Sequence, residues 1–205
     1  MINLYVVRHG ETEWNKQRRI QGQLDSVLTA EGKRQAELLR PRLETVDFDG
    51  LISSPSKRAV QTAEILVSGR GLSIQTDKRL MEIHLGEWQG KTYDEVLKSD
   101  VDRFKCYREN PEKFTCKGGE NFFDVKNRVE AFLADMEKEK KKGNYLIVTH
   151  GMVIRVLLSI CKNLPISEVW KVSNVENTSL TIIKLENGAK ELLLEGDASH
   201  IMGLV

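Results

Sequence analysis

Short apolar runs of β-prone residues recur along the chain. They lie at 2–7, 51–53, 72–76, 146–148, 179–185 and 191–194. The run at 2–7 is almost uninterrupted by polar residues, a pattern typical of a central strand that is buried on both faces of a sheet. The last two runs flank Asn187-Gly188, a pair that favours a tight hairpin turn. The pattern therefore predicts several strands, the last two joined as a closing hairpin.

Between these runs, apolar residues recur at helical spacing. Thr29 precedes one such stretch and is predicted to cap its helix, which Pro41 should kink or end early. Ser54-Pro55-Ser56 predicts a cap and a proline at the first helical position, for a helix that runs to about Ser68 and carries Arg58 in its first turn. Two further apolar helical faces lie at 122–136 and 152–161.

Strands that alternate with helices predict an α/β fold. We expect a three-layer α/β/α sandwich with a mainly parallel central sheet, in a single domain that covers 1–205. A charged, weakly amphipathic stretch at 93–110 precedes breaks at Pro111 and Gly118-Gly119. It predicts a helical insertion at about 91–120 that lies over the core.

Composition excludes several classes of protein. The 205 residues are 40% hydrophobic and 30% charged, which excludes disordered, collagen-like and coiled-coil chains. Lys and Arg number 31 against 30 Asp and Glu, so the net charge of +1 argues against the broad basic face that nucleic acid or an anionic membrane requires. A lysine cluster at 138–142 is interleaved with Glu139, and we interpret it as a solvated helix end.

The sequence favours a cytoplasmic location. No uncharged stretch approaches the roughly 18 residues that a membrane span requires, and Met1-Ile2-Asn3-Leu4 does not resemble a secretory leader. The cysteines Cys106, Cys116 and Cys161 are odd in number and lack C-x-x-C spacing, so we expect reduced thiols, with a Cys106–Cys116 bond as the less favoured alternative. We expect neither a nucleic-acid partner nor a membrane partner. A homodimer is possible, and the apolar tail at 201–205 could join its subunits.

Two buried strands end in the same dipeptide. Arg8-His9-Gly10 follows the run at 2–7, and Thr149-His150-Gly151 follows the run at 146–148. Because ligands of open α/β sheets bind at the carboxyl ends of strands, both histidines should lie in one crevice. Arg8 and Arg58 are expected beside them, where helix N-termini add positive potential. Such a pocket suits a dianion.

These residues belong to a longer pattern that resembles the histidine phosphatase (phosphoglycerate mutase-like) superfamily. The matching motifs occur in order along most of the chain: Arg8-His9-Gly10-Glu11-Thr12-Glu13-Trp14-Asn15, Leu28-Thr29-Ala30-Glu31-Gly32 with Gln35-Ala36, Ser53-Ser54-Pro55 with Arg58-Ala59 and Gln61-Thr62-Ala63, Glu82 with Gly86-Glu87-Trp88-Gln89-Gly90, Gly118-Gly119-Glu120, and Val148-Thr149-His150-Gly151. The resemblance implies a phosphoglycerate mutase-like fold.

The resemblance also implies roles for individual residues. His9 would be the nucleophile and Glu82 the proton donor. Arg8, Arg58 and His150 would bind the phosphoryl group with help from Asn15, and the substrate site would also include Gln21, Gly22 and Gly151. Glu11, Glu13 and Glu87 compete with Glu82 for the acid role on residue type alone, and only the position of Glu82 in the motif favours it.

The chemistry can be derived from the residues themselves. A neutral imidazole can attack phosphorus and form a phosphohistidine that water later hydrolyses. Its other nitrogen must hold a proton, for which we expect a backbone carbonyl near Gly10 as the acceptor. Arginine forks can bind the phosphoryl oxygens, so the reaction needs no metal or other cofactor. A zinc site of His9, His84 and His150 is the less favoured alternative, because adjacent arginines repel a dication.

The predicted activity is therefore metal-independent hydrolysis of a small phosphorylated metabolite. The Glu-Trp-Gln-Gly and Gly-Gly-Glu motifs are similar to those of α-ribazole phosphatases and broad-specificity bacterial phosphatases. Two alternatives stay open, a phosphoglycerate mutase and a non-catalytic module that binds phosphate esters. Cations of the insertion could bind a second anion, but we favour a solvent-facing role for them; they are Lys98, Arg103, Lys105, Arg108 and Lys113.

Overall fold

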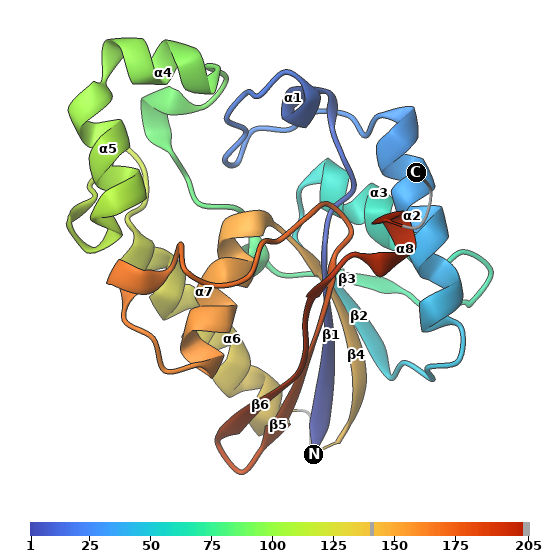
Figure 1. The fold of residues 1–205 in the computed structure, drawn as a ribbon. Helices are drawn as coiled ribbons and strands as arrows, with labels where there is room; N and C mark the ends of the chain where they lie inside the picture. Colours follow the sequence, from blue (N-terminus) through green and yellow to red (C-terminus); the bar gives the residue numbers. More distant parts are fainter. Residues whose placement is uncertain (140–141, 203–205) are drawn as a thin grey trace.

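The protein is built around one twisted sheet (Figure 1). The structure, a computed structural model, describes residues 1–139 and 142–202. The sheet has the order β3-β2-β4-β1-β5-β6. Its strands are β1 (Ile2–Arg8), β2 (Gly50–Ser53), β3 (Ile74–Thr76), β4 (Gly143–Thr149), β5 (Leu180–Glu186) and β6 (Ala189–Asp197).

Most of the sheet is parallel, as the sequence predicted. Strand β1 pairs in parallel with β4, β4 with β2, and β2 with β3, whereas β5 and β6 are antiparallel. The register aligns Arg8 with Thr149, and the amide of His9 donates to the carbonyl of Thr149 at 3.0 Å. Consequently β1 and β4 end at the same level, and the residues that follow them emerge together.

Helices cover both faces of the sheet and form the predicted three layers (Figure 1). Helices α2 (Ala30–Leu43), α3 (Lys57–Leu66) and α8 (Ser199–Met202) lie on one face, and α6 (Phe122–Glu139) and α7 (Gly151–Cys161) lie on the other. Two separate apolar clusters fill the spaces between the sheet and these helices. The short elements are α1 (Glu13–Lys16), η1 (Lys78–Leu80), η2 (Gly86–Trp88), η3 (Pro111–Lys113) and η4 (Ile166–Glu168).

Neither Pro41 nor Pro55 sets a helix boundary as predicted. Thr29 caps α2 as expected, its hydroxyl accepting from the amide of Gly32 at 2.9 Å, but the helix does not end early at Pro41. It continues to Leu43. Pro41 lacks an amide proton and so removes one hydrogen bond near the helix end, but the helical turn that follows keeps Leu43 fully buried. Pro55 does not occupy the first helical position, since α3 begins at Lys57 with Ser56 as its cap. Arg58 nevertheless lies in the first turn.

The insertion consists of two consecutive helices that pack on the body through aromatic rings. Helices α4 (Tyr93–Ser99) and α5 (Val101–Glu109) break at Asp100. The ring of Tyr107 lies 5.0 Å from that of Phe114 and 5.2 Å from those of Phe122 and Trp170, measured between centroids. The contacts of Tyr107 with Phe114 and Trp170 are edge-to-face, and such contacts stabilise by more than their buried area alone. The insertion is thereby joined to α6 and to the segment after η4.

The hairpin turn and the cysteines agree with the sequence predictions. Asn187 and Gly188 have φ of 52° and 81°, the left-handed conformations that the hairpin turn between β5 and β6 requires. All three cysteines are free thiols. No helix among residues 1–139 and 142–202 is long and apolar enough to cross a membrane. Lys140 and Lys141 of the lysine cluster, and 203–205 of the apolar tail, lie outside the described residues.

We predict that Phe122 stabilises the docking of the insertion and that its neighbour does not. Phe122 is fully buried among the aromatic rings, whereas Phe123 is 45% exposed. Replacement of Phe122 by Ala should lower the free energy of unfolding by about 3–5 kcal/mol, and Phe123→Ala should change it by less than about 0.5 kcal/mol. Urea denaturation measures both. Equal losses in the two variants would contradict the packing described.

Candidate active site

His9 follows β1 and is almost completely buried. Its Nδ1 lies 2.8 Å from the carbonyl oxygen of Gly10. Because a carbonyl only accepts hydrogen bonds, Nδ1 carries the proton and Nε2 keeps a lone pair. This Nε2 accepts a long hydrogen bond of 3.3 Å from Nε of Arg58. The imidazole is therefore held as the tautomer that the sequence predicted.

Two glycines let the turn after His9 pack against the start of α2. A Cβ at Gly10 would lie 2.4 Å from the carbonyl oxygen of Gly32, and a Cβ at Gly32 would lie 2.0 Å from the carbonyl oxygen of Glu11. No larger residue fits either position without movement of the backbone. The hydroxyl of Thr62 accepts from the amide of Gly10 at 3.0 Å and donates to the carbonyl of Arg58 at 2.7 Å. The turn and α3 are thereby fixed to each other.

Arg58 is the centre of the buried hydrogen-bond network, with only 1% of its surface exposed. Besides His9, its guanidinium donates to the carbonyls of Leu24 and Gly22, both at 2.7 Å, and to the carboxylate of Asp25 at 2.9 Å. The first turn of α3 directs this side chain inward from the end of β2. Burial lowers the pKa of Arg58 while Asp25 raises it. The arginine therefore ties the loop at 22–25 to the imidazole.

His150 lies at the end of β4 as the residue that precedes α7, and it faces His9. The two ring centroids are 5.1 Å apart. Nη2 of Arg58 donates to Nδ1 of His150 at 3.1 Å, so the proton of this imidazole lies on Nε2 and is donated to Oγ of Ser54 at 2.7 Å. Both histidines thus accept hydrogen bonds from the same guanidinium.

Both imidazoles are neutral. Burial lowers the pKa of His9 well below its ordinary value, and the charges of Arg58 and Arg8 lower it further. Burial also lowers the pKa of His150, and the charge of Arg58 lowers it further. A neutral imidazole keeps the lone pair that nucleophilic attack requires.

Arg8 presents an unsatisfied donor at the same place. Its Nη1 donates to the carbonyl of Val175 at 2.7 Å. Its Nε is buried and has no hydrogen-bond partner among the described residues. A Cβ placed on Gly151 would lie 3.6 Å from this nitrogen, so the guanidinium lies over the first residue of α7. A buried donor without a partner is destabilising by itself and fits a site that awaits an anionic ligand.

Glu82 reaches the N-terminus of α7 from the loop after η1. Its carboxylate accepts from the amide of Met152 at 3.2 Å and from the amide of Ile83 at 2.9 Å. Its carbonyl accepts from the side chain of Gln23 at 3.1 Å. The positive end of α7 stabilises a carboxylate here.

Glu120 of the Gly-Gly-Glu motif fixes the loop that carries Glu82. Its carboxylate accepts from the amide of His84 at 2.8 Å, and its own amide donates to the carbonyl of His84 at 2.7 Å. Arg128 holds the same carboxylate at 2.9 Å. A Cβ on Gly119 would lie 2.3 Å from the carbonyl of His84, so the motif approaches the loop as closely as only glycine allows.

A small cleft of about 90 Å³ opens beside His9 and Arg58. Its lining residues are Arg8, His9, Asn15, Arg19, Ile20, Gln21, Gly22, Arg58, Glu82, Ile83, Leu85, Tyr93 and Tyr107. Seven of the nine predicted site residues are in this lining. Of the other two, His150 lies beyond Arg58 and Gly151 lies beneath Arg8. A more open groove of about 720 Å³, between α7 and the β5–β6 turn, contains none of them.

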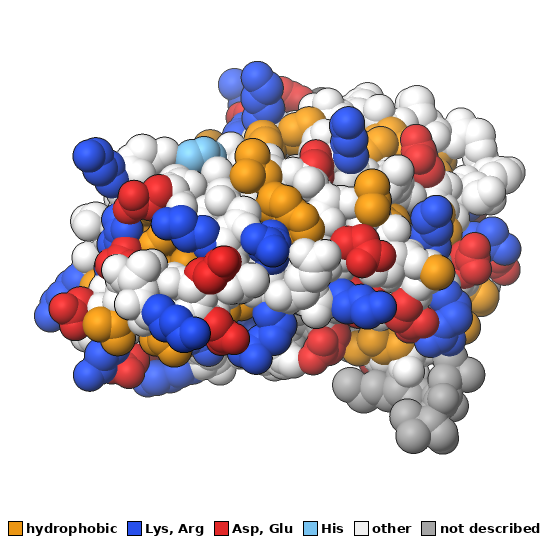
Figure 2. All heavy atoms as spheres, turned by 90° about the horizontal axis from the view of Figure 1, so that it is seen from above, with side chains coloured by type: hydrophobic (Ala, Val, Ile, Leu, Met, Phe, Trp, Pro, Cys, Tyr) orange, Lys and Arg blue, Asp and Glu red, His pale blue; other side chains and the backbone are white. Residues whose placement is uncertain are grey.

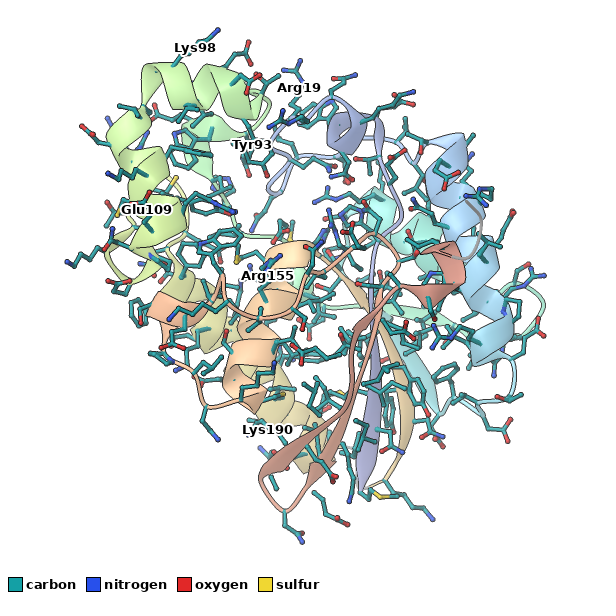
Figure 3. All side chains as sticks on the ribbon, in the orientation of Figure 1. Arg19, Tyr93, Lys98, Glu109, Arg155 and Lys190 are labelled. Atoms are coloured by element: carbon teal, nitrogen blue, oxygen red, sulfur yellow. The ribbon has the colours of Figure 1, made fainter. Side chains whose placement is uncertain are left out.

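The sequence missed the residues that form the mouth of the cleft. Tyr93 and Tyr107 come from the insertion, and Arg19 and Ile20 precede the predicted Gln21. In Figure 3, Tyr93 reaches from α4 toward the opening of the cleft. Helical periodicity indicates which face of the insertion is apolar, but it does not reveal which ring faces the cleft. The link between the two segments, a bridge of Arg19 with Thr92, also has no signal in the sequence.

Several other candidate side chains have local structural roles. Oδ1 of Asn15 accepts from the amide and hydroxyl of Thr12 in a capping box, although Asn15 also lines the cleft. Trp88 is buried and donates to Asp100 rather than facing the cleft. Nδ1 of His84 accepts a hydrogen bond from the amide of Gly86 at 3.3 Å, within the same loop. Within the described ranges, no group of three His, Cys, Asp or Glu side chains is placed to hold a metal ion.

The surface above the cleft carries charges of both signs. Figure 2 looks onto this end of the molecule and shows Lys and Arg side chains interspersed with Asp and Glu, with apolar side chains between them. The local positive charge at the cleft is therefore not the edge of a broad basic face.

Comparison with known proteins identifies the family. Residues 4–198 match the model of the histidine phosphatase superfamily (branch 1). The chain belongs to this superfamily. It is 32% identical over 201 residues to phosphoserine phosphatase 1 of Hydrogenobacter thermophilus, covering 98% of this chain and 95% of that protein. It is 35% identical over 202 residues to phosphoglycerate mutase-like protein 4 of Arabidopsis thaliana, covering 97% of this chain and 86% of that protein.

A solved structure agrees with the fold. The structure titled Bacillus stearothermophilus YhfR superposes with a TM-score of 0.93 at 41% identity, covering 98% of this chain and all of that one. The family and fold predicted from the sequence motifs are confirmed, as is the prediction of a phosphatase of the histidine phosphatase superfamily.

The two buried histidines of this superfamily member predict a pH-dependent stability. Both stay neutral in the folded protein, but in the unfolded chain they take up protons as the pH falls through about 6.5. The unfolded state then binds more protons, so the free energy of unfolding falls below pH 6.5, by up to about 1.4 kcal/mol per pH unit for each histidine.

Urea denaturation between pH 7 and pH 5 measures this slope. The His9→Asn variant, which keeps only His150 of the pair, should show a distinctly smaller slope because one imidazole no longer titrates on unfolding. An identical slope in the variant and the wild type would argue against a neutral, buried His9.

Proposed function

We propose that this protein hydrolyses phosphomonoesters of small metabolites through a phosphohistidine at Nε2 of His9. In this proposal Glu82 is the general acid and base. Arg8, Arg58 and His150 bind the phosphoryl group, and Asn15, Gln21, Gly22 and Gly151 complete the substrate site. Hydrolysis is preferred to the mutase reaction, because the second anion clamp and longer insertion of a mutase are not evident after Glu82 in the sequence.

The observation that carries the proposal is the state of His9. Nδ1 donates to Gly10 at 2.8 Å, and Nε2 carries the lone pair, which accepts a long hydrogen bond of 3.3 Å from Arg58 where His9 lines the cleft. The nucleophile is therefore oriented and deprotonated before any substrate enters. The volume of about 90 Å³ suits a phosphoryl group with a small part of the leaving group.

The proposed reaction has two displacements. In the first, the lone pair of Nε2 forms a bond to phosphorus while the bond from phosphorus to the ester oxygen breaks. Glu82, which takes up a proton when the negatively charged phosphate binds beside it, gives this proton to the departing alkoxide. In the second, Glu82 takes a proton from water, the water oxygen bonds to phosphorus, and the bond to Nε2 breaks. Inorganic phosphate leaves, and the imidazole and the carboxyl group return to their starting states.

Electrostatic stabilisation comes from donors that are already in place. Negative charge on the equatorial phosphoryl oxygens would be met by Nε of Arg8, which has no partner among the described residues, by the charge of Arg58 and by the positive end of α7. Arg58 donates to several protein acceptors, so its position does not depend on the substrate. In the proposed mechanism these cations serve in place of a metal ion.

We predict that phosphate release depends on His9 and not on a metal. The wild type should hydrolyse p-nitrophenyl phosphate equally well with and without EDTA, and His9→Ala should lower kcat/KM by at least about a thousandfold, because it removes the covalent route. Phosphate release is measured directly. Quenching in alkaline detergent during turnover should also trap a phosphoryl enzyme that is base-stable and that acid then hydrolyses.

Each alternative gives a different result in the same assay. Wild-type protein that binds phosphate esters without turnover would indicate a binding module. Inhibition by EDTA would indicate a metal site. Transfer of phosphate between the positions of glycerate would indicate a mutase.

We predict that Glu82 matters most for substrates with poor leaving groups. Glu82→Gln should lower kcat/KM for an alkyl phosphate by about 10²–10⁴-fold, but it should affect p-nitrophenyl phosphate far less, since p-nitrophenolate leaves without a proton. Glu120→Gln should also lower kcat/KM more for the alkyl phosphate than for p-nitrophenyl phosphate, by a smaller factor than Glu82→Gln, because it loosens the loop that carries Glu82. Glu13→Gln, an exposed carboxylate near the site, is the matched control. A uniform loss on both substrates would contradict the acid role of Glu82.

The cytoplasmic location, the absence of a nucleic-acid partner, the single domain and the possible homodimer stay predictions. A small, free phosphate ester as substrate is consistent with all of them.

A further inference from the structure

The segment that precedes β5 holds the backbone of the residues that follow β1. The amide of Thr178 donates to the carbonyl of Arg8 at 3.0 Å, and Nη1 of Arg8 donates to the carbonyl of Val175 at 2.7 Å. Nδ2 of Asn177 donates to the carbonyl of His9 at 3.0 Å. Among these three bonds, that of Asn177 is the one the segment makes with a side chain. A single side chain therefore links this segment to the backbone of His9.

The bond from Asn177 completes the restraint of one peptide group. The carbonyl of His9 and the amide of Gly10 belong to the same planar unit, and in a trans peptide they point in opposite directions. The carbonyl accepts from Asn177, while the amide donates to the hydroxyl of Thr62 at 3.0 Å. Thr62 is fully buried and Asn177 is half-buried. Two segments far apart along the chain thus fix this peptide from opposite sides.

The orientation of this peptide decides where the imidazole proton lies. The next carbonyl, that of Gly10, accepts the Nδ1 proton of His9 at 2.8 Å. Gly10 has no side chain to restrict its backbone, so hydrogen bonds at both ends of the peptide must supply the restriction. Rotation of the peptide would move the Gly10 carbonyl away from Nδ1. The proton could then pass to Nε2, which would lose the lone pair that attacks phosphorus.

The residue type at position 177 suits this task. A primary amide donates a hydrogen bond without adding a charge beside His9, whereas a carboxylate would direct an acceptor at the carbonyl oxygen. The next residue, Thr178, is fully buried with φ of 56°, a conformation that is costly for a β-branched residue. Its hydroxyl donates to the carbonyl of Asn177 at 2.8 Å. The surrounding contacts therefore hold the segment in a strained turn that presents Asn177 to His9.

We propose that Asn177 is a positioning residue for the nucleophile. It holds the peptide between His9 and Gly10, so that Nδ1 keeps the proton and Nε2 keeps the lone pair. This inference rests on the proposed function, in which His9 attacks phosphorus. Loss of the Asn177 donor should slow the attack and leave phosphate binding intact, because the charges of Arg8 and Arg58 remain.

Kinetics of Asn177→Leu tests the proposal, since leucine has nearly the same size and no donor. The value of kcat/KM should fall by about tenfold for an alkyl phosphate and for p-nitrophenyl phosphate alike, because attack by Nε2 is common to both esters. The inhibition constant of inorganic phosphate should stay within about twofold of the wild-type value. Ser173→Ala, an exposed position in the same segment, should leave both quantities unchanged.

Nitrogen NMR of the histidine rings provides a readout that a merely structural role would not move. At pH 7 the wild type should show His9 as a single tautomer protonated at Nδ1, with its signals assigned by their absence from His9→Asn. In Asn177→Leu the same ring should show a mixture of the two neutral tautomers. Urea denaturation verifies that the variant is folded under the conditions of both measurements.

The outcomes separate this inference from the proposed function. An unchanged kcat/KM in Asn177→Leu would overturn the positioning role. A loss that weakens phosphate binding by the same factor and leaves the tautomer of His9 unchanged would also overturn it, and would assign Asn177 to folding alone. A wild type that turns over no ester would refute the proposed function instead, and the two NMR spectra would still test whether Asn177 fixes the tautomer.

Discussion

The site depends on one buried guanidinium. Arg58 lies between the rings of His9 and His150 and also holds the loop at 22–25 through two carbonyls and a carboxylate. Burial of a charge is strongly unfavourable unless its donors are satisfied, so the surrounding chain must supply acceptors in one particular geometry. The same bonds that satisfy the arginine therefore orient the two imidazoles and close one wall of the cleft.

This arrangement separates charge from nucleophilicity. Positive charge comes from arginines, which do not lose their protons, while the histidines are kept neutral by burial and by those neighbouring charges. A cationic His9 would have no lone pair, and a cleft without arginines would not attract a phosphate dianion. Hydrogen bonds to Gly10 and Ser54 assign each imidazole proton to the nitrogen away from Arg58. The same arginines thus keep His9 neutral and attract a phosphate dianion to the cleft.

The body and the insertion contribute different parts of the site. The parallel strands and their following helices position the side chains proposed to bind the phosphoryl group, whereas α4 and α5 supply Tyr93 and Tyr107. The cleft therefore combines side chains from the sheet ends with aromatic side chains from the insertion.

The sequence by itself determined the strands, the α/β class and the catalytic motifs, because hydrophobic period and glycine positions are local properties. Even the tautomer of His9 was predictable, since its partner Gly10 is the next residue. The extent of α2 past Pro41 and the start of α3 after Pro55 depended on burial and capping, which local propensity does not encode. Only the tertiary structure brought Tyr93 and Tyr107 to the cleft and paired Arg58 with Asp25. Those contacts join segments far apart along the chain, and their geometry follows from packing of the aromatic cluster rather than from any spacing in the sequence.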